Sequence, residues 1–219
     1  MTKHERYQDY VIRDGRLIGE FEQMYRDFDN PWRQNDELQF TSDKAVGLYL
    51  LSRLRRRHGV ERALELGCGL GNYAAEIART GLQVTGIDVS PSAIEKAALR
   101  YPGLDFRAGA LSDRQLIKDI RPDVVVMSEI TWYVLEELRD FIDFLKHGLP
   151  DAYLFHTLNT YPPGVQKYGA EFFTNLAGIK DFFGMTYLES GEIFYQGGVR
   201  TWFLGSWRSE AETAWNAVA

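Results

Sequence analysis

Two carboxylates and a cluster of glycines are the residues of this chain best suited to hold a ligand. Glu65 stands just ahead of Gly67, Gly69 and Gly71, and Asp88 lies 21 residues after Gly67. The segment from Glu65 to Gly71 and Asp88 each follow a short apolar run that is typical of a strand. A glycine turn after the first of these strands brings backbone without side chains close to a ligand. A carboxylate at the tip of the next strand suits ribose hydroxyls. The pattern predicts a site for an adenosine-containing cofactor.

The glycine spacing indicates which cofactor this is. A dinucleotide fingerprint reads G-x-G-x-x-G and directs a helix N-terminus at a pyrophosphate. Here the spacing is G-x-G-x-G, and Glu65 suits a positively charged amino group better than a pyrophosphate. The segment resembles motif I of the class I S-adenosylmethionine (SAM)-dependent methyltransferases, with Asp88 as their acidic residue after the second strand. Two alternatives stay open: an NAD-dependent oxidoreductase, and a non-catalytic partner protein with the SAM-binding fold.

The elements that must position these residues alternate between strand and helix. A helix is expected to open at Ser90-Pro91, because serine caps helices and proline suits their first turn. The other predicted elements are strands at 62–66, 83–88, 104–108, 123–127 and 152–156, helices at about 71–80, 136–147 and 171–183, and two strands over about 186–207. Alternation of this kind predicts an α/β fold with a Rossmann-like doubly wound sheet, and the terminal pair adds an antiparallel edge strand. The resemblance implies the seven-stranded class I methyltransferase fold.

Residues 1–40 are expected to form an N-terminal extension ahead of a methyltransferase domain at 41–219. The extension holds a hairpin signal around Asp14-Gly15 and a helical pattern from Glu20 to about Phe28. A further helix is expected from Thr41 or Ser42 to about His58. The aromatic side chains of the extension suit a lid that excludes water from the active site, and a helix packed on the sheet edge is the alternative.

Ligands of open α/β sheets bind at the carboxyl ends of the strands. By resemblance, the glycine turn contacts the methionine part of SAM, Asp88 holds the ribose, and the residues after the second and third strands flank the adenine. Ser128 would offer its carbonyl to the cofactor amine. The predicted cofactor-binding residues are Glu65, Gly67, Cys68, Gly69, Asp88, Val89, Ala110, Leu111 and Ser128.

Methyl transfer from a sulfonium needs the acceptor held at about 3 Å and, for oxygen acceptors, a base. The candidate bases near the strand ends are Glu129, His156 and Tyr133. Each has a structural alternative: an ion pair or substrate contact for Glu129, a strand-end hydrogen bond for His156, and core packing for Tyr133. The predicted substrate-binding residues are Tyr7, Trp32, Trp132 and Asn159.

Two further segments narrow the resemblance. The segment D-N-P-W-R at 29–33 and the segment S-E-I-T-W-Y-V-L at 128–135 look like the nodulation N-methyltransferase (NodS-like) group, which carries D-P-W ahead of motif I and S-E-[VI]-x-Y-Y after the fourth strand. The chain departs from that pattern by inserting Asn30 and by placing Trp132 where tyrosine is usual. The resemblance implies methylation at oxygen or nitrogen of a small polar acceptor. A sugar or another surface-carbohydrate (capsule or polysaccharide) precursor or modifying group is the leading expectation.

Composition excludes several other classes. The net charge of −6 lacks the basic footprint of nucleic-acid binding, and the segment after the fourth strand lacks the [DNS]-P-P-[YFW] pattern of base-methylating enzymes. No apolar run approaches the roughly 18 residues of a membrane span. Cys68 is the only cysteine, which excludes an intramolecular disulfide, and no cluster has metal-ligand spacing. We therefore expect a cytoplasmic enzyme with a small-molecule acceptor and no metal, with a peptide acceptor and a homodimer left open.

Overall fold

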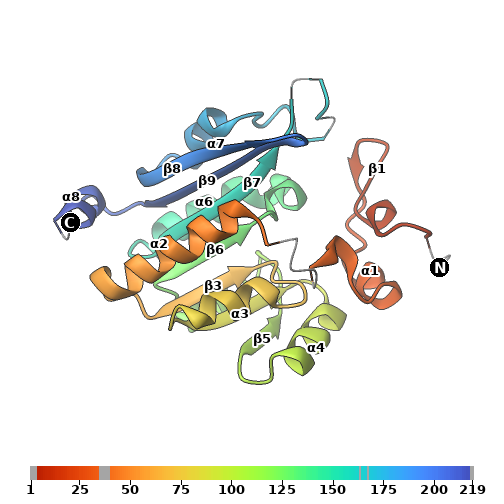
Figure 1. The fold of residues 1–219 in the computed structure, drawn as a ribbon, viewed down its shortest axis with the longest axis horizontal. Helices are drawn as coiled ribbons and strands as arrows, with labels where there is room; N and C mark the ends of the chain where they lie inside the picture. Colours follow the sequence, from red (N-terminus) through yellow and green to blue (C-terminus); the bar gives the residue numbers. More distant parts are fainter. Residues whose placement is uncertain (1–3, 35–39, 163, 167, 218–219) are drawn as a thin grey trace.

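The chain folds around a seven-stranded sheet with helices on both faces (Figure 1). The computed structural model describes residues 4–34, 40–162, 164–166 and 168–217, so residues 1–3 and 35–39 of the predicted extension lie outside the described residues. The strand order is β5-β4-β3-β6-β7-β9-β8. The strands are β3 (Arg62–Leu66), β4 (Gln83–Asp88), β5 (Asp105–Ala108), β6 (Val124–Ser128), β7 (Tyr153–Thr160), β8 (Thr186–Tyr195) and β9 (Gly198–Ser206).

The sheet is parallel from β5 to β7, and β9 pairs antiparallel with both β7 and β8. This confirms the predicted doubly wound sheet with an antiparallel strand near one edge, which is β9, between β7 and the edge strand β8. The apolar run of β6 is buried on both faces, because Val125 and Met127 join one core cluster while Val124 and Val126 join the other. Because the strands from β5 to β7 run in the same direction, their carboxyl ends lie together at one end of the sheet.

Helices cover the two faces as separate layers. On one face, α2 (Ser42–His58), α3 (Asn72–Arg79) and the short α8 (Ala211–Asn216) contribute to one core cluster. On the other face, α5 (Arg114–Ile120), α6 (Leu135–Gly148) and α7 (Leu176–Phe183) contribute to the second cluster. A further helix, α4 (Pro91–Arg100), packs on β4 and β5. None of the helices in the described part of the chain is long and apolar enough to cross a membrane.

An N-terminal segment, residues 4–34, packs beside the carboxyl ends of the parallel strands (Figure 1). It contains β1 (Ile12–Arg13), β2 (Arg16–Leu17) and α1 (Phe21–Asp27), with short 3-10 helices before and after them. The predicted hairpin is confirmed, and both turn residues, Asp14 and Gly15, have the positive φ that a tight hairpin turn requires. Tyr10, Met24 and Tyr25 form a small apolar cluster of their own, which includes Leu70 from the glycine turn.

Some element boundaries differ from the predictions. The helix expected from residue 171 begins only at Leu176, where the Asn175 side chain accepts the Gly178 N–H and caps it. The strand expected to end at residue 156 continues to Thr160, because β9 pairs with β7 along its whole length. The short helices α5 and α8 were not predicted.

Candidate active site

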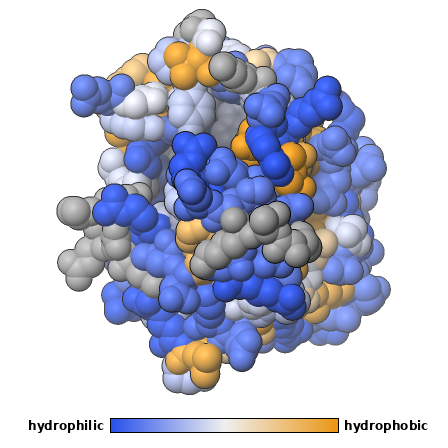
Figure 2. All heavy atoms as spheres, turned by 90° about the vertical axis from the view of Figure 1, so that its right-hand side faces the viewer, coloured by the Kyte–Doolittle hydropathy of each residue, from blue (hydrophilic) through white to orange (hydrophobic). Residues whose placement is uncertain are grey.

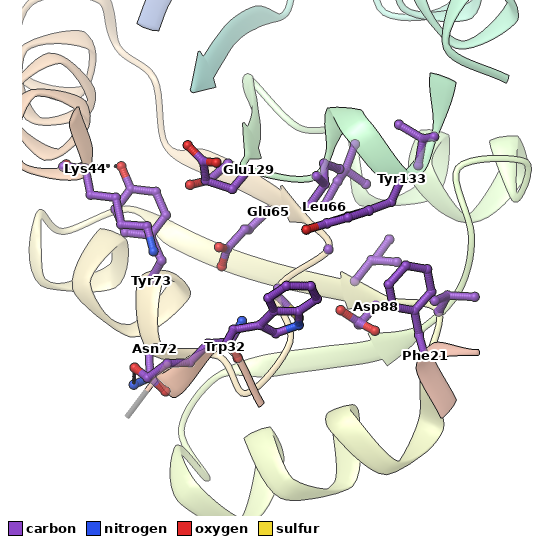
Figure 3. A pocket seen from close by; sticks show the side chains of 18 of the residues that line it. Phe21, Trp32, Lys44, Glu65, Leu66, Asn72, Tyr73, Asp88, Glu129 and Tyr133 are labelled. Carbon is purple, nitrogen blue, oxygen red and sulfur yellow. Dashed lines mark hydrogen bonds between the residues drawn. The ribbon is translucent and has the colours of Figure 1, made fainter. Parts of the chain in front are cut away.

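A cavity of about 1060 Å³ opens at the carboxyl ends of the parallel strands. The N-terminal segment and the first turn of α2 form its outer walls. The predicted site residues that line it are Glu65, Gly67, Cys68, Asp88, Val89, Ala110, Leu111, Ser128, Glu129, Tyr133, Trp32 and Asn159. The fold therefore brings most of the positions selected from the sequence together around one cavity (Figure 3).

The glycine turn has a shape that side chains would prevent. Gly67, Gly69 and Gly71 all have positive φ, the region that disfavours other residues. A Cβ added at Gly67 would lie 2.3 Å from Cγ2 of Ile130. Gly67 is thus required both by its backbone conformation and by the close approach of the segment after β6.

Asp88 at the end of β4 is held by the backbone of both neighbouring loops. Its Oδ2 accepts the Gly69 N–H at 2.9 Å, and its Oδ1 accepts the Ser90 N–H at 2.9 Å. Burial raises the pKa of Asp88 to about 6, although the two N–H donors favour its ionised form. The carboxylate is therefore fixed in orientation at the cavity wall before any ligand binds.

Glu65 at the end of β3 is a buried carboxylate that is only partly satisfied. Its Oε2 has no hydrogen-bond partner among the described residues. Burial raises the pKa of Glu65 to about 8, while the charge of Lys44 opposes that shift and the charge of Asp88 adds to it. Because a buried unpaired carboxylate is unfavourable, a cationic or hydrogen-bond-donating ligand group would stabilise this position.

Lys44 and Tyr73 form the wall of the cavity on the other side of Glu65 from Asp88 (Figure 3). The Lys44 Nζ atom lies 5.4 Å from the centre of the Tyr73 ring, and the Tyr73 hydroxyl donates to the Lys44 carbonyl at 3.2 Å. Sequence reasoning missed both residues. Neither belongs to a motif, and Lys44 reaches the site only because α2 packs beside α3.

The N-terminal segment contacts the glycine turn directly. The side-chain Oε1 of Gln34 accepts the Leu70 N–H at 2.9 Å, and Gln34 also hydrogen-bonds the Tyr25 hydroxyl. A Cβ at Gly69 would lie 2.6 Å from the side chains of both Gln34 and Tyr25. Gly69, expected to contact the cofactor, is therefore covered by this segment rather than lining the cavity.

A second contact joins the N-terminal segment to the loop after β4. Glu22 accepts the Ser90 hydroxyl at 2.7 Å and the Ser92 hydroxyl at 2.8 Å. Ser90 at the same time accepts the Ala93 N–H and caps α4, as the sequence predicted. The loop that follows Asp88 is thus positioned partly by Glu22.

Glu129 follows β6 in a strained backbone conformation, with φ of 63°. Its Oε2 accepts the Asn159 N–H at 3.2 Å, whereas its buried Oε1 has no hydrogen-bond partner among the described residues. Burial raises the pKa of Glu129 to about 7, and the charge of Asp43 adds to the rise, while the Asn159 N–H, Lys44 and Arg200 oppose it. Near neutral pH this carboxyl group is therefore able both to take and to give a proton.

Aromatic rings from the N-terminal segment and from the segment after β6 form one wall of the cavity. The Tyr133 ring lies 5.6 Å from that of Trp32 and 5.5 Å from that of Phe21, measured between centroids (Figure 3). Burial raises the pKa of Tyr133 well above its ordinary value, which favours the protonated hydroxyl over the phenolate that a base would need. Tyr7 packs behind Trp32 at 4.9 Å and does not itself line the cavity.

The structure contradicts the prediction that His156 is a base. Its ring is fully buried, stacks on Phe203 at 4.8 Å, and is hydrogen-bonded through Nε2 to the Thr131 hydroxyl at 2.8 Å. Burial lowers its pKa to about 3, which keeps the imidazole neutral. The alternation of side chains along β7 directs His156 into the core under α7 and away from the cavity.

Trp132 also points away from the cavity, contrary to its predicted role in substrate binding. Its ring is buried 5.3 Å from the Phe173 ring, and its N–H donates to the Asn159 carbonyl at 2.9 Å. Trp132 therefore supports Asn159 from behind. No group of three or more His, Cys, Asp and Glu side chains within the described ranges could hold a metal ion.

Comparisons with known proteins find methyltransferases among the proteins similar to this chain. Residues 64–150 match a family model described as a methyltransferase domain. Nodulation protein S from Bradyrhizobium diazoefficiens is 29% identical over 116 residues, which cover 52% of this chain and 52% of that protein. A ubiquinone biosynthesis O-methyltransferase from Vibrio cholerae is 34% identical over 95 residues, 43% of this chain and 32% of the relative. The chain thus spans about a third to a half of the length of the curated relatives it matches.

The architecture has counterparts among solved structures. The N-methyltransferase NodS from Bradyrhizobium japonicum, crystallised with S-adenosyl-L-homocysteine (SAH), superposes with a TM-score of 0.63 at 21% identity. The match covers 84% of this chain and 97% of that one. At this identity the likeness shows a common fold.

Proposed function

We propose that this chain, a member of the class I SAM-dependent methyltransferases, transfers a methyl group from SAM to an oxygen or nitrogen atom of a small polar acceptor. The observation that carries the proposal is the pair of buried carboxylates, Glu65 and Asp88, on either side of Gly67 in one cavity. Oε2 of Glu65 accepts no hydrogen bond from the residues that the structure describes, and Asp88 is already oriented by two backbone N–H groups.

The residues present suit the parts of SAM. Glu65 would hold its amino group, because the unpaired Oε2 needs a donor or a cation. Lys44, beyond Glu65, would hold the carboxylate, and Asp88 the ribose hydroxyls. Val89, Ala110 and Leu111 line the part of the cavity nearest Asp88, where they would flank the adenine. Bound SAM supplies an electrophilic methyl group on a good leaving group.

Around the acceptor, the protein orients, excludes water and takes up a proton. Glu129 would receive that proton, since no described residue hydrogen-bonds to its buried Oε1 and its pKa lies near 7. Trp32, Phe21 and Tyr133 wall off this part of the cavity from water. An oxygen acceptor would need Glu129 as a base, whereas an amine would need only to arrive neutral.

The acceptor end of the cavity favours a polyhydroxylated molecule such as a sugar or surface-carbohydrate (capsule or polysaccharide) precursor. Asn159, Tyr161, Tyr195 and Arg200 line it together with Glu129. Amide, phenol, guanidinium and carboxylate groups in one place can donate to and accept from several hydroxyls. The face that carries the N-terminal segment is mostly hydrophilic (Figure 2), as suits an acceptor that arrives from water.

Titration calorimetry with SAH tests the cofactor assignment. Wild-type protein is expected to bind SAH, and Asp88→Ala is expected to lose most of that affinity. Absence of binding to both SAM and SAH would overturn the proposal. A nicotinamide fluorescence titration tests the NAD-dependent alternative, and transfer of isotopically labelled methyl groups from SAM to pools of nucleotide sugars distinguishes an enzyme from a non-catalytic protein.

We also propose that the N-terminal segment is a lid. Its contacts reach the glycine turn through Gln34, the loop after β4 through Glu22, and Tyr133 through Trp32. Deletion of residues 1–30 tests this role. A folded protein that still binds SAH but transfers no methyl group supports a lid, and an unfolded protein shows instead that the segment is part of the core.

A further inference from the structure

An ion pair between a buried and a partly buried residue lies at the acceptor end of the cavity, and its carboxylate, Asp43, has no part in the scheme above. Asp43, in the first turn of α2, is fully buried. Its Oδ1 lies 3.5 Å from Nη1 of Arg200 on β9, and neither carboxylate oxygen accepts a hydrogen bond from the described residues. A buried carboxylate held only by a loose ion pair contributes little stability. Because the pair contributes little to stability, we look for its role in its effect on neighbouring residues.

The register of β9 on β7 places Arg200 opposite Asn159, and the Asn159 N–H donates to Glu129 Oε2 at 3.2 Å. Asp43 is the charge that most raises the pKa of Glu129 after burial itself, and Arg200 lowers it. The other groups that face Glu129 are Lys44 from α2, the Asn159 N–H from β7, and the Tyr133 hydroxyl from the segment after β6. Glu129 thus lies in a field of two opposed charges, Asp43 and Arg200, that are tied to each other.

We propose that Asp43, acting through its ion pair with Arg200, is a positioning residue that sets how readily Glu129 takes a proton from the acceptor. This inference rests on the proposed function. In that step the acceptor atom bonds to the methyl carbon, the methyl–sulfur bond breaks with its electron pair left on sulfur, and the acceptor proton passes to a Glu129 oxygen. Without Asp43, Arg200 and Lys44 would hold Glu129 ionised and weaken it as a base. Without Arg200, the charge of Asp43 would keep Glu129 protonated and unable to accept.

Infrared difference spectroscopy on the full chain bound to SAH measures the protonation of Glu129, and it needs no known acceptor. The protonated-carboxyl band that disappears in Glu129→Gln reports the titration of Glu129. We expect Asp43→Asn to move its midpoint down by about one pH unit and Arg200→Met to move it up by about one unit. The double variant should return close to wild type, and Arg200→Lys, which keeps the charge, should stay there.

SAH affinity, measured by calorimetry on the same proteins, is expected to stay within about twofold of wild type because neither residue touches the predicted cofactor end. A purely structural role would change stability and leave the midpoint where it is. Midpoints that fail to move, or that move in the same direction in both single variants, overturn the inference while the proposed function stands. Failure of the wild-type protein to bind SAH overturns the proposed function and this inference with it.

Discussion

Gly69 donates its backbone N–H to the Asp88 carboxylate at 2.9 Å, which links the turn after β3 to the end of the neighbouring strand β4. The glycine turn and the acidic residue are therefore one hydrogen-bonded unit rather than two independent ligand contacts. Ser90 donates to the other oxygen of the same carboxylate. A change at Asp88 is expected to affect the shape of the site as well as its charge.

Asp88→Ala should weaken SAH binding by at least about tenfold, or ~1.4 kcal/mol. It should also lower the free energy of unfolding by about 1–3 kcal/mol, because the Gly69 and Ser90 N–H groups lose their acceptor. Calorimetry and urea denaturation measure the two effects. Asp88→Asn is the matched control, since its amide oxygen can still accept one N–H. Unchanged SAH affinity in Asp88→Ala would contradict the assignment of this residue to the ribose.

Glu65→Gln should distinguish ligands that carry the methionine amine from ligands that lack it. We expect SAH to bind about tenfold more weakly, because the charge that faces its ammonium group is lost. Methylthioadenosine, which has neither amine nor carboxylate, should bind the variant and the wild type about equally. Competition calorimetry with both ligands gives the comparison. An equal loss for both ligands would show that Glu65 does not face the amine.

The stability of the ligand-free protein should depend on pH through Glu65. Its pKa is about 8 in the folded chain, against an ordinary value of 4.5. Between these values the folded state holds a proton that the unfolded chain has released, so the free energy of unfolding falls as pH rises. Relative to Glu65→Gln, wild type should lose about 2 kcal/mol between about pH 5.5 and about pH 7.5. Urea denaturation measures this difference, with exposed Glu95→Gln as the control; parallel slopes in wild type and Glu65→Gln would refute the expectation.

His156→Gln should separate stability from ligand binding. The substitution disturbs a buried ring stacked on Phe203 and the hydrogen bond to Thr131. A loss of about 1–3 kcal/mol in the free energy of unfolding is expected, with SAH affinity within about twofold of wild type. Thermal unfolding with and without SAH measures both the stability of the variant and its binding of SAH. A selective loss of SAH binding without loss of stability would contradict the core role of His156 and would support a role in the site.

Glu22→Ala should loosen the N-terminal segment. The variant removes the acceptor of the Ser90 and Ser92 hydroxyls, so the segment should open more often. Limited proteolysis should then cleave within residues 4–34 several times faster than in wild type, and SAH should restore protection. Exposed Glu5→Ala serves as the control. Identical cleavage rates in all three proteins would show that this contact does not hold the segment in place.

Much of the fold could be predicted because its signals are local. The apolar runs of β3, β4 and β6 and the cap at Ser90 specify their elements from neighbouring residues alone. The end of β7 could not be predicted in this way. Residues 157–160 continue the strand because β9, about forty positions later, supplies its hydrogen bonds.

The same division applies to the site. The sequence by itself determined the proposed cofactor end, since Glu65, the glycine turn and Asp88 lie within one β-α-β unit whose geometry follows from strand, turn and spacing. Only the tertiary structure decided the proposed acceptor end. Strand alternation and layer packing turned His156 and Trp132 into the core, and the packing of α2 and β9 brought Lys44, Asp43 and Arg200 beside Glu129. Contacts between segments so far apart in the sequence depend on how the helices and strands pack in layers. A local sequence pattern does not predict that packing.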